Sequence, residues 1–324
     1  MAAKVASVEP AAVDRAVEAF TEARPRLFGI AYRMLGSAVD ADDLLQDVWL
    51  RWQTYDHSKV DNSTAFLATV TTRLAINATQ SARARHETYT GQWLPEPVDT
   101  AADPQLGAER EAALEFAVLM LLEKLPATER AAYVLREAFD YPYAQIAEIV
   151  QVNEVAARQL VSRARKHLAA ERRTPATPAD QRRLLTAFVA AAKSGDLATL
   201  EELLAADVVS YSDGGGVARA SKIPVVGRER VSKYVRAFAD RFWVGVDVDW
   251  VDANGQTAAL LTVDGERYGM VTVAVSDEGI DRVLWLLNPG KLGAIQANAT
   301  NAALVAPDAS AARPPCREGR VRGV

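Results

Sequence analysis

The residues of this chain best suited to bind another molecule are the cationic and amide side chains between positions 154 and 168. At about 100° per residue, this segment divides into two faces. The apolar face consists of Ala157, Leu160, Val161, Ala164 and Leu168. The opposite face carries Arg158, Gln159, Ser162, Arg163 and Lys166, with Arg165 next to it. One face is expected to pack, and the other to contact an anion.

A shorter helix and a tight turn precede this segment. Its apolar side is formed by Ile146, Ala147, Ile149 and Val150. Gln151 and Val152 interrupt it, and Asn153 is a good N-cap with Glu154 in the first turn. The pattern matches a helix-turn-helix whose second helix lies in the major groove of DNA, where Arg and Gln read base edges and Lys holds phosphates. The alternative is a solvated face on an ordinary helical hairpin, which the turn, the N-cap and the one-sided charge together disfavour.

Length and composition limit the possible classes of protein. With 324 residues, two or three domains are expected. The chain has 37 Lys and Arg and 42 Asp and Glu, so its net charge is −5. Any surface for nucleic acid must therefore be local or helped by a partner. Cys316 is the one cysteine, which excludes a disulfide framework and favours a reducing cytosol. No signal-peptide pattern or long apolar run is present, so we expect a cytoplasmic protein without membrane contact, metal or cofactor.

The first third of the chain is predicted to be helical. Apolar residues at helical spacing predict a helix from Phe20 to Leu35 that ends at Gly36. Asp40 is predicted to cap a second helix. The buried stripe of that helix is Leu44, Leu45, Val48, Trp49 and Trp52.

One leucine lies on the polar face of this second helix. Leu50 falls beside Asp43, Gln46, Asp47 and Gln53, far around from the buried stripe. A single exposed leucine is usually unremarkable. Among acids and amides at helical spacing it also offers a docking strip for helices of another protein, and the pattern alone leaves both interpretations open.

A third helix buries Phe66, Leu67, Val70 and Leu74. Its other side is predicted to show Thr69, Thr72, Arg73, Ile76, Gln80, Arg83, Arg85 and His86. This basic surface is compatible with phosphates or unstacked bases, and equally with a solvated face. The sequence from Trp93 to Pro97 then excludes a helix because its two prolines restrain the backbone, so residues 91–108 are predicted to be a linker with Trp93 as a docking anchor. Helices resume at about Glu109 and continue through Phe139 into the helix-turn-helix.

Residues 18–172 resemble the sigma factors of the extracytoplasmic-function group. The resemblance depends on Asp42 to Leu50 in the first module, and on Leu125 to Arg130 and Gln145 to Arg165 in the second. In that family the first module holds the clamp helices of RNA polymerase and melts the minus-ten element. The second binds the polymerase flap and the minus-thirty-five element.

The resemblance implies roles for individual residues. The implied polymerase-binding residues are Asp43, Gln46, Asp47, Leu50 and Gln53. The implied promoter contacts are Asn153, Glu154, Arg158, Gln159, Ser162, Arg163, Arg165 and Lys166, with Thr72, Arg73, Gln80 and Arg83 in the first module.

The last part of the chain is predicted to be an α+β domain. Helices come first, and strands from about Val244 to Leu287 are separated by Asn-Gly, Asp-Gly and Glu-Gly pairs at hairpin spacing. The predicted divisions are a module at 14–90, the linker at 91–108, a module at 109–172, a linker at 173–180, the α+β domain at 181–292 and a mobile tail at 293–324.

This domain resembles the SnoaL-like domains of the cone-shaped, nuclear-transport-factor-like fold, and its fusion to sigma modules resembles one subgroup of sigma factors. The motifs shared with that subgroup are Trp93-Leu94-Pro95-Glu96-Pro97, Asp213-Gly214-Gly215-Gly216 and Asn288-Pro289-Gly290-Lys291-Leu292. The cone of such domains binds a small hydrophobic ligand, so an unknown small molecule is a further implied partner. No enzymatic set is visible, because this half has no His and acids such as Asp247 or Asp249 fit the outer face of a strand equally well.

The leading hypothesis is a promoter-specificity subunit, not an enzyme, with its C-terminal domain as intramolecular regulator. The alternative is a SnoaL-like enzyme or ligand sensor that carries a DNA-binding region and acts as an ordinary transcription regulator. In the leading hypothesis the three motifs meet, with Trp93 largely buried and Lys291 paired with Asp213 or Glu96.

Overall fold

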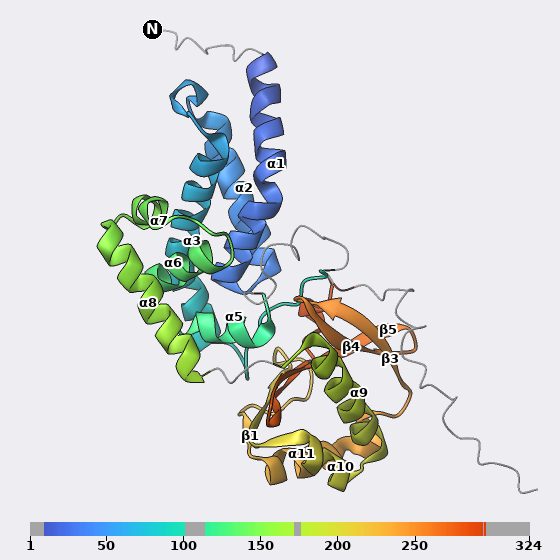
Figure 1. The fold of residues 1–324 in the computed structure, drawn as a ribbon. Coiled ribbons are helices and arrows are strands. Elements are labelled where there is room, and N and C mark those ends of the chain that lie inside the picture. Colours follow the sequence, from blue (N-terminus) through green and yellow to red (C-terminus); the bar gives the residue numbers. More distant parts are fainter. Residues whose placement is uncertain (1–9, 101–113, 172–175, 294, 296–324) are drawn as a thin grey trace, which may run out of the picture.

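The computed structural model describes residues 10–100, 114–171, 176–293 and 295, without the side chains of 10–13 and 82–87. Two bodies are visible in Figure 1, a helical one formed by the first half of the chain and a mixed one formed by the second. Among the described helices, none combines the length and the apolar character that crossing a membrane requires.

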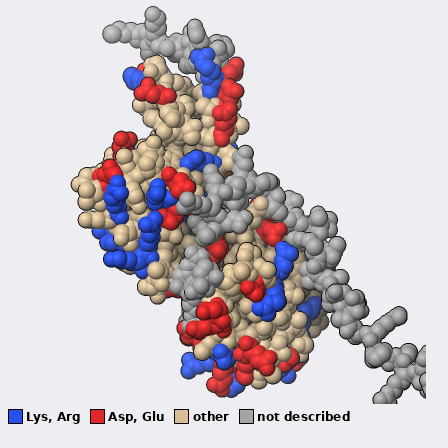
Figure 2. Space-filling model, viewed as in Figure 1, with Lys and Arg blue, Asp and Glu red and all other residues tan. Residues whose placement is uncertain are grey.

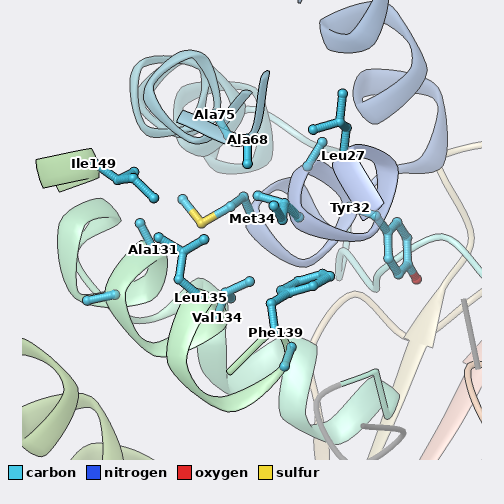
Figure 3. Packing of buried hydrophobic residues seen from close by; sticks show 14 of the residues in the cluster. Leu27, Tyr32, Met34, Ala68, Ala75, Ala131, Val134, Leu135, Phe139 and Ile149 are labelled. Atoms are coloured by element: carbon cyan, nitrogen blue, oxygen red, sulfur yellow. The ribbon is translucent and has the colours of Figure 1, made fainter. Parts of the chain in front are cut away.

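The helical body contains both predicted modules. The first comprises α1 (Pro10–Leu35), α2 (Ala38–Thr54), a 3-10 turn (His57–Lys59) and α3 (Ser63–Glu87). The second comprises α5 (Phe116–Glu123), α6 (Ala127–Glu137), α7 (Tyr143–Val150) and α8 (Glu154–Glu171). Both contribute to one hydrophobic core, in which Met34 of α1 lies among Ala131, Val134 and Leu135 of α6 (Figure 3). The modules are therefore docked against each other.

The junction of α1 and α2 differs from the sequence prediction in its cap. Gly36 adopts φ +69° and ends α1 as expected. The N-cap of α2 is Ser37, whose side chain accepts a hydrogen bond from Asp40 N, so the prediction of Asp40 as the cap is wrong. The helix begins at Ala38, so Ser37 has the N-cap position and Asp40 lies in the first turn. Trp49 is only partly buried, with its ring centre 5.0 Å from that of Phe20.

The helix-turn-helix forms where the sequence predicts it. The shorter helix α7 ends at Val150, and Gln151 provides a left-handed cap with φ +60°. The side chain of Asn153 accepts a hydrogen bond from Ala156 N, which confirms Asn153 as the N-cap of α8. Each of the five residues predicted for the apolar face of α8 is buried.

The mixed body is the predicted α+β domain. Its helices are α9 (Pro178–Ser194), α10 (Leu197–Leu203) and α11 (Arg228–Phe242). Its strands are β1 (Leu204–Asp213), β2 (Val225–Val226), β3 (Val246–Ala253), β4 (Gln256–Val263), β5 (Glu266–Ser276) and β6 (Gly279–Leu286), with a 3-10 turn at Pro289–Lys291.

The strand order is β2-β1-β6-β5-β4-β3. The antiparallel meander from β3 to β6 is confirmed, and Asn254-Gly255 and Asp264-Gly265 make two-residue turns with positive φ at both positions. The sequence did not predict that β1 pairs in parallel with β6. This pairing places the end of β1, with Asp213, beside the end of β6.

Each face of the sheet is apolar and covered. One face packs with α9, α10 and α11 around residues such as Phe188, Val235 and Trp285. The other face packs against the helical body, where Leu94 and Phe116 join Leu260, Met270 and others of the sheet in one buried cluster. The second face therefore attaches the C-terminal domain to the helical modules.

Candidate functional site

The free face of α8 presents its polar side chains to solvent. Arg158, Gln159, Ser162, Arg163, Arg165 and Lys166 are all exposed, as are Asn153 and Glu154 at the start of the helix. Lys and Arg side chains gather over this helix in Figure 2. The exposed side of α8 is therefore a cationic helix surface, and the major groove of DNA is wide enough to admit an α-helix.

Several of these cations have partners within the protein. Arg158 pairs with Glu154 at 2.5 Å, and its guanidinium lies 4.6 Å from the centre of the Tyr143 ring. Acids of α6 hold two others, since Arg163 lies 2.7 Å from Glu129 and Arg165 lies 2.6 Å from Glu137. Within the described residues, Gln159, Ser162 and Lys166 have no such partner.

The predicted surface of α3 is formed in part among the described residues, where Arg73 and Gln80 are exposed and Thr69 and Ile76 are partly buried. Thr72 is buried, and its hydroxyl donates to Ala68 O at 2.8 Å, so its prediction as a free side chain is wrong. The reason is a second buried stripe of small residues, which are Ala68, Thr72, Ala75 and Thr79. Because α3 packs against α1, α6 and α7, it is buried over a wider arc than its large apolar residues indicate.

Arg73 and its neighbours have different surroundings. Arg73 is exposed, but its guanidinium donates to Ile149 O at 3.0 Å and Glu148 O at 2.9 Å. These carbonyls lie at the C-terminal end of α7, where the helix dipole favours a cation. Arg73 thus links the first module to the helix-turn-helix. Gln80 is exposed, and the side chain of Arg83 lies outside the described residues.

The polar face of α2 has the predicted phase. Leu50 is 59% exposed, and Asp43, Gln46, Asp47 and Gln53 around it are exposed too. The hydrophobic stripe of the same helix points into the core, with Leu44, Leu45, Val48 and Trp52 buried. Leu50 therefore lies outside the buried stripe of α2, with most of its side chain exposed to solvent.

A buried ion pair brings together the motif that begins at Asp213, the motif that contains Lys291 and the linker motif that contains Leu94. Lys291 Nζ lies 2.8 Å from Asp213 Oδ2, and both side chains are buried. The same ammonium donates to the carbonyl of Leu94 and lies 4.4 Å from the centre of the Trp93 ring. Burial lowers the pKa of the Lys291 ammonium, and the Asp213 carboxylate opposes that shift. The expected pairing of Lys291 with Asp213 is confirmed.

The carboxylate of Asp213 is fully hydrogen-bonded. It accepts from Leu94 N at 3.0 Å, from the Tyr89 hydroxyl at 2.6 Å and from Gly215 N at 3.1 Å. Asn288 Nδ2 donates to the same Tyr89 hydroxyl at 2.7 Å. Burial, assisted by the hydrogen bond to Asp213, raises the pKa of Tyr89. Sequence reasoning did not identify Tyr89, which has no motif of its own.

The glycines after Asp213 permit close approach of neighbouring residues. Gly215 has φ +60°, and a Cβ there would lie 2.5 Å from the side chain of Asn288. Gly216 has φ +75°, and a Cβ there would lie 3.1 Å from Thr90. At Gly214 an added Cβ would meet the Ala218 carbonyl at 2.5 Å. The loop therefore requires glycine for contact as well as for backbone conformation.

The Trp-Leu-Pro-Glu-Pro segment is packed along its length. Trp93 is largely but not completely buried, as expected, and its ring lies over Gly36, where an added Cβ would be 2.7 Å away. Leu94 and Pro95 are buried, so Leu94 is the anchor at the centre of the contact. At the other end of the cluster Leu292 is buried and Pro289 is exposed.

Glu96 attaches this segment to the first module. Its carboxylate accepts from Ser37 Oγ at 3.0 Å, Ala38 N at 2.7 Å and Val39 N at 3.2 Å. These are free donors at the N-terminus of α2, where a negative charge is also favoured by the helix dipole. A residue from the linker thus completes the cap of a helix in another part of the chain.

Asn254 joins four segments through one amide side chain. Its Nδ2 donates to the Tyr32 hydroxyl at 2.7 Å and to Leu114 O at 3.1 Å, and its Oδ1 accepts from Val98 N at 2.9 Å. The Tyr32 hydroxyl in turn donates to Glu96 O at 2.5 Å. Sequence reasoning treated Asn254 as a turn residue only, because an Asn-Gly pair already has that explanation.

Comparisons with known proteins agree with this arrangement. The family model for sigma-70 region 2 matches residues 19–85, and the model for sigma-70 region 4 matches residues 115–168. The ECF RNA polymerase sigma factor SigJ of Mycobacterium tuberculosis (strain ATCC 25618 / H37Rv) is 35% identical over 289 residues, covering 85% of this chain and 92% of SigJ. The chain belongs to the family of ECF RNA polymerase sigma factors.

A second relative and one solved structure agree with this assignment. The probable ECF RNA polymerase sigma factor SigI of M. tuberculosis (strain CDC 1551 / Oshkosh) is 29% identical and covers 85% of this sigma factor and 93% of SigI. The crystal structure of M. tuberculosis SigJ matches with a TM-score of 0.70 and 32% identity, over 87% of this chain and all of that one. Both matches extend beyond the two sigma-70 regions into the α+β domain.

We predict that Lys291→Met loosens the contact between the C-terminal domain and segment 88–100. Removal of the ammonium leaves the Asp213 carboxylate buried without its countercharge, which costs roughly 3–5 kcal/mol. Hydrogen exchange of the Leu94 and Val98 amides measures the effect, and both should exchange faster. The control is Lys59→Met, which removes an exposed ammonium paired with Asp56 and should leave exchange unchanged. Equal protection in both variants would show that the buried pair does not hold the contact.

Proposed function

We propose that this sigma factor directs core RNA polymerase to specific promoters in the cytoplasm. The observation that carries the proposal is the helix-turn-helix, in which α8 buries one complete face and presents Arg158, Gln159 and Lys166 on the other. The names of the relatives, which are RNA polymerase sigma factors, support the same function. In this proposal α8 binds the minus-thirty-five element, and the first module binds the minus-ten element through Arg73 and Gln80.

The strip on α2 is proposed to bind the clamp helices of the polymerase. Leu50 supplies an exposed apolar contact, and the acids and amides around it supply a polar rim. The second module is proposed to bind the flap. The residues of the α2 strip are exposed and lie outside the buried stripe of that helix.

We predict that Leu50→Asp weakens association with core polymerase by at least tenfold, because the apolar contact at the centre of the strip is replaced by a charge. Affinity is measured by fluorescence anisotropy of the labelled sigma factor titrated with core polymerase. Val17→Asp on α1, at a residue 43% exposed, is the matched control and should bind as the wild type does. Equal affinity of both variants would exclude the α2 strip as the polymerase contact.

We predict that Arg158 contacts a base edge and that Lys166 contacts a phosphate. Arg158→Ala should cost about 1–3 kcal/mol on the preferred promoter and relax preference at one base pair, if its guanidinium leaves Glu154 to contact a base edge. Lys166→Ala should weaken all duplexes alike and lower the salt slope of binding by about one. Binding of the holoenzyme to single-substitution promoter duplexes at several salt concentrations measures both. A uniform loss for Arg158→Ala would assign it to phosphate instead.

The C-terminal domain is proposed to regulate how the two modules separate. The minus-ten and minus-thirty-five elements lie about 25 base pairs apart, which is roughly 85 Å of B-form duplex. Modules that share a core and a direct hydrogen bond from Arg73 to Ile149 are too close to reach both elements at once. The compact arrangement is therefore the resting state, and the C-terminal domain stabilises it through Leu94 and Glu96, which it holds against α2 and the sheet.

We predict that Lys291→Met raises transcription from a responsive promoter at limiting polymerase, because weaker docking increases the population of the open state. Multiple-round transcription with core polymerase measures the effect, with Lys59→Met as the unchanged control. Loss of the hydrogen-exchange protection without a change in transcription would contradict a regulatory role for the contact.

The C-terminal domain is proposed to act without catalysis and without a cofactor. Asp247 and Asp249, the acids that the sequence left open, are exposed on the edge strand β3. Their position favours solvation over acid-base chemistry inside the cone. No observation on the described residues favours an enzyme or a ligand sensor as a separate function.

A further inference from the structure

Val155 is a large apolar side chain on the DNA-facing side of α8. It is 65% exposed, one residue after the start of the helix at Glu154. At about 100° per residue, Ser162 and Lys166 lie within about 20° of it around the helix axis. Val155 thus occupies the centre of the free face, opposite the buried stripe.

Neither packing nor helix stability explains a valine at this position. Val150 and Val152, a few residues earlier, both pack against the hydrophobic core, whereas Val155 does not. Valine is also a weaker helix former than alanine or the straight-chain residues, because its branched side chain is restricted in a helix. An exposed valine is common on surfaces, but here it lies between polar side chains that are proposed to contact DNA.

We propose that Val155 determines specificity by contacting the C5-methyl group of one thymine in the minus-thirty-five element. This inference rests on the proposed DNA-binding function of α8. The thymine methyl is the apolar group that base pairs present in the major groove, and aliphatic side chains recognise it by contact. The N-terminal residues of a recognition helix are the ones that reach base edges, which is where Val155 lies.

Two side chains near Val155 have different surroundings. Arg158, three residues further on, lies about 60° from Val155 around the helix axis, on the side where Glu154 and the Tyr143 ring hold its guanidinium in the free protein. Gln159, also one turn on, has no partner among the described residues and is available to the adjacent base pair. An apolar contact beside an amide contact reads two neighbouring positions of one strand.

The test replaces thymine by deoxyuridine, which removes the methyl and leaves base pairing intact. A preferred duplex is first selected from a random-sequence library with the wild-type holoenzyme, and each thymine of its minus-thirty-five element is then replaced in turn. Wild-type holoenzyme should bind about fourfold more weakly at one replaced position, the factor that burial of one methyl-sized group gives. Holoenzyme with Val155→Ala should bind the thymine and deoxyuridine duplexes equally at that position.

Val39→Ala is the matched control, because Val39 is 61% exposed on α2 and far from the helix-turn-helix in sequence. It should keep the fourfold preference of the wild type. The inference is overturned if the wild type discriminates at no thymine, or if Val155→Ala retains the preference. Failure of the wild type to enrich any duplex in the selection would instead overturn the proposed DNA-binding function, and the inference with it.

Discussion

The contact between Lys291 and Asp213 is the interaction on which the arrangement of this sigma factor depends. Two buried charges are costly unless each is paired and fully hydrogen-bonded. Here the missing partners come from Tyr89 and from the backbone of Leu94, which belong to the segment between the modules. The pair is therefore satisfied only when this segment lies against the C-terminal domain. Folding of the α+β domain and placement of the segment are coupled by the cost of leaving the pair incomplete.

Helix α5 extends the same coupling to the second module. Its eight residues are almost entirely apolar, so it has no face suited to solvent. Val118, Leu121 and Leu122 pack in the helical core, whereas Phe116 and Met120 pack against the sheet of the C-terminal domain. Separation of the domain would expose the second set, at about 1.5–3 kcal/mol for each large apolar side chain. Any separation of the C-terminal domain from the second module therefore needs replacement contacts for Phe116 and Met120.

The cationic face of α8 is partly neutralised by acids within the protein. Its arginines pair with Glu154, Glu129 and Glu137 within the protein, which limits the repulsion among cations on one face. The arginine side chains are about half exposed, and ion pairs at such sites contribute little to stability. Phosphates or base edges can replace Glu154 and Glu137 at small cost, whereas Glu129 is buried and its carboxylate depends on Arg163. A chain of net charge −5 can in this way keep a local cationic surface for DNA.

The sequence by itself determined what depends on local spacing. The two faces of α8, the cap at Asn153 and the exposure of Leu50 follow from helical periodicity, and the turns of the β3–β6 meander follow from their Asn-Gly and Asp-Gly pairs. The resemblance of its motifs to known sequences indicated the sigma factor family. Tertiary structure decided what depends on residues far apart. Thr72 is buried because α3 packs on several helices, and Asp213 meets Lys291 because β1 runs parallel to β6. Asn254 shows the limit most clearly, since its local signal indicates only a turn, while its side chain joins segments more than 200 residues apart.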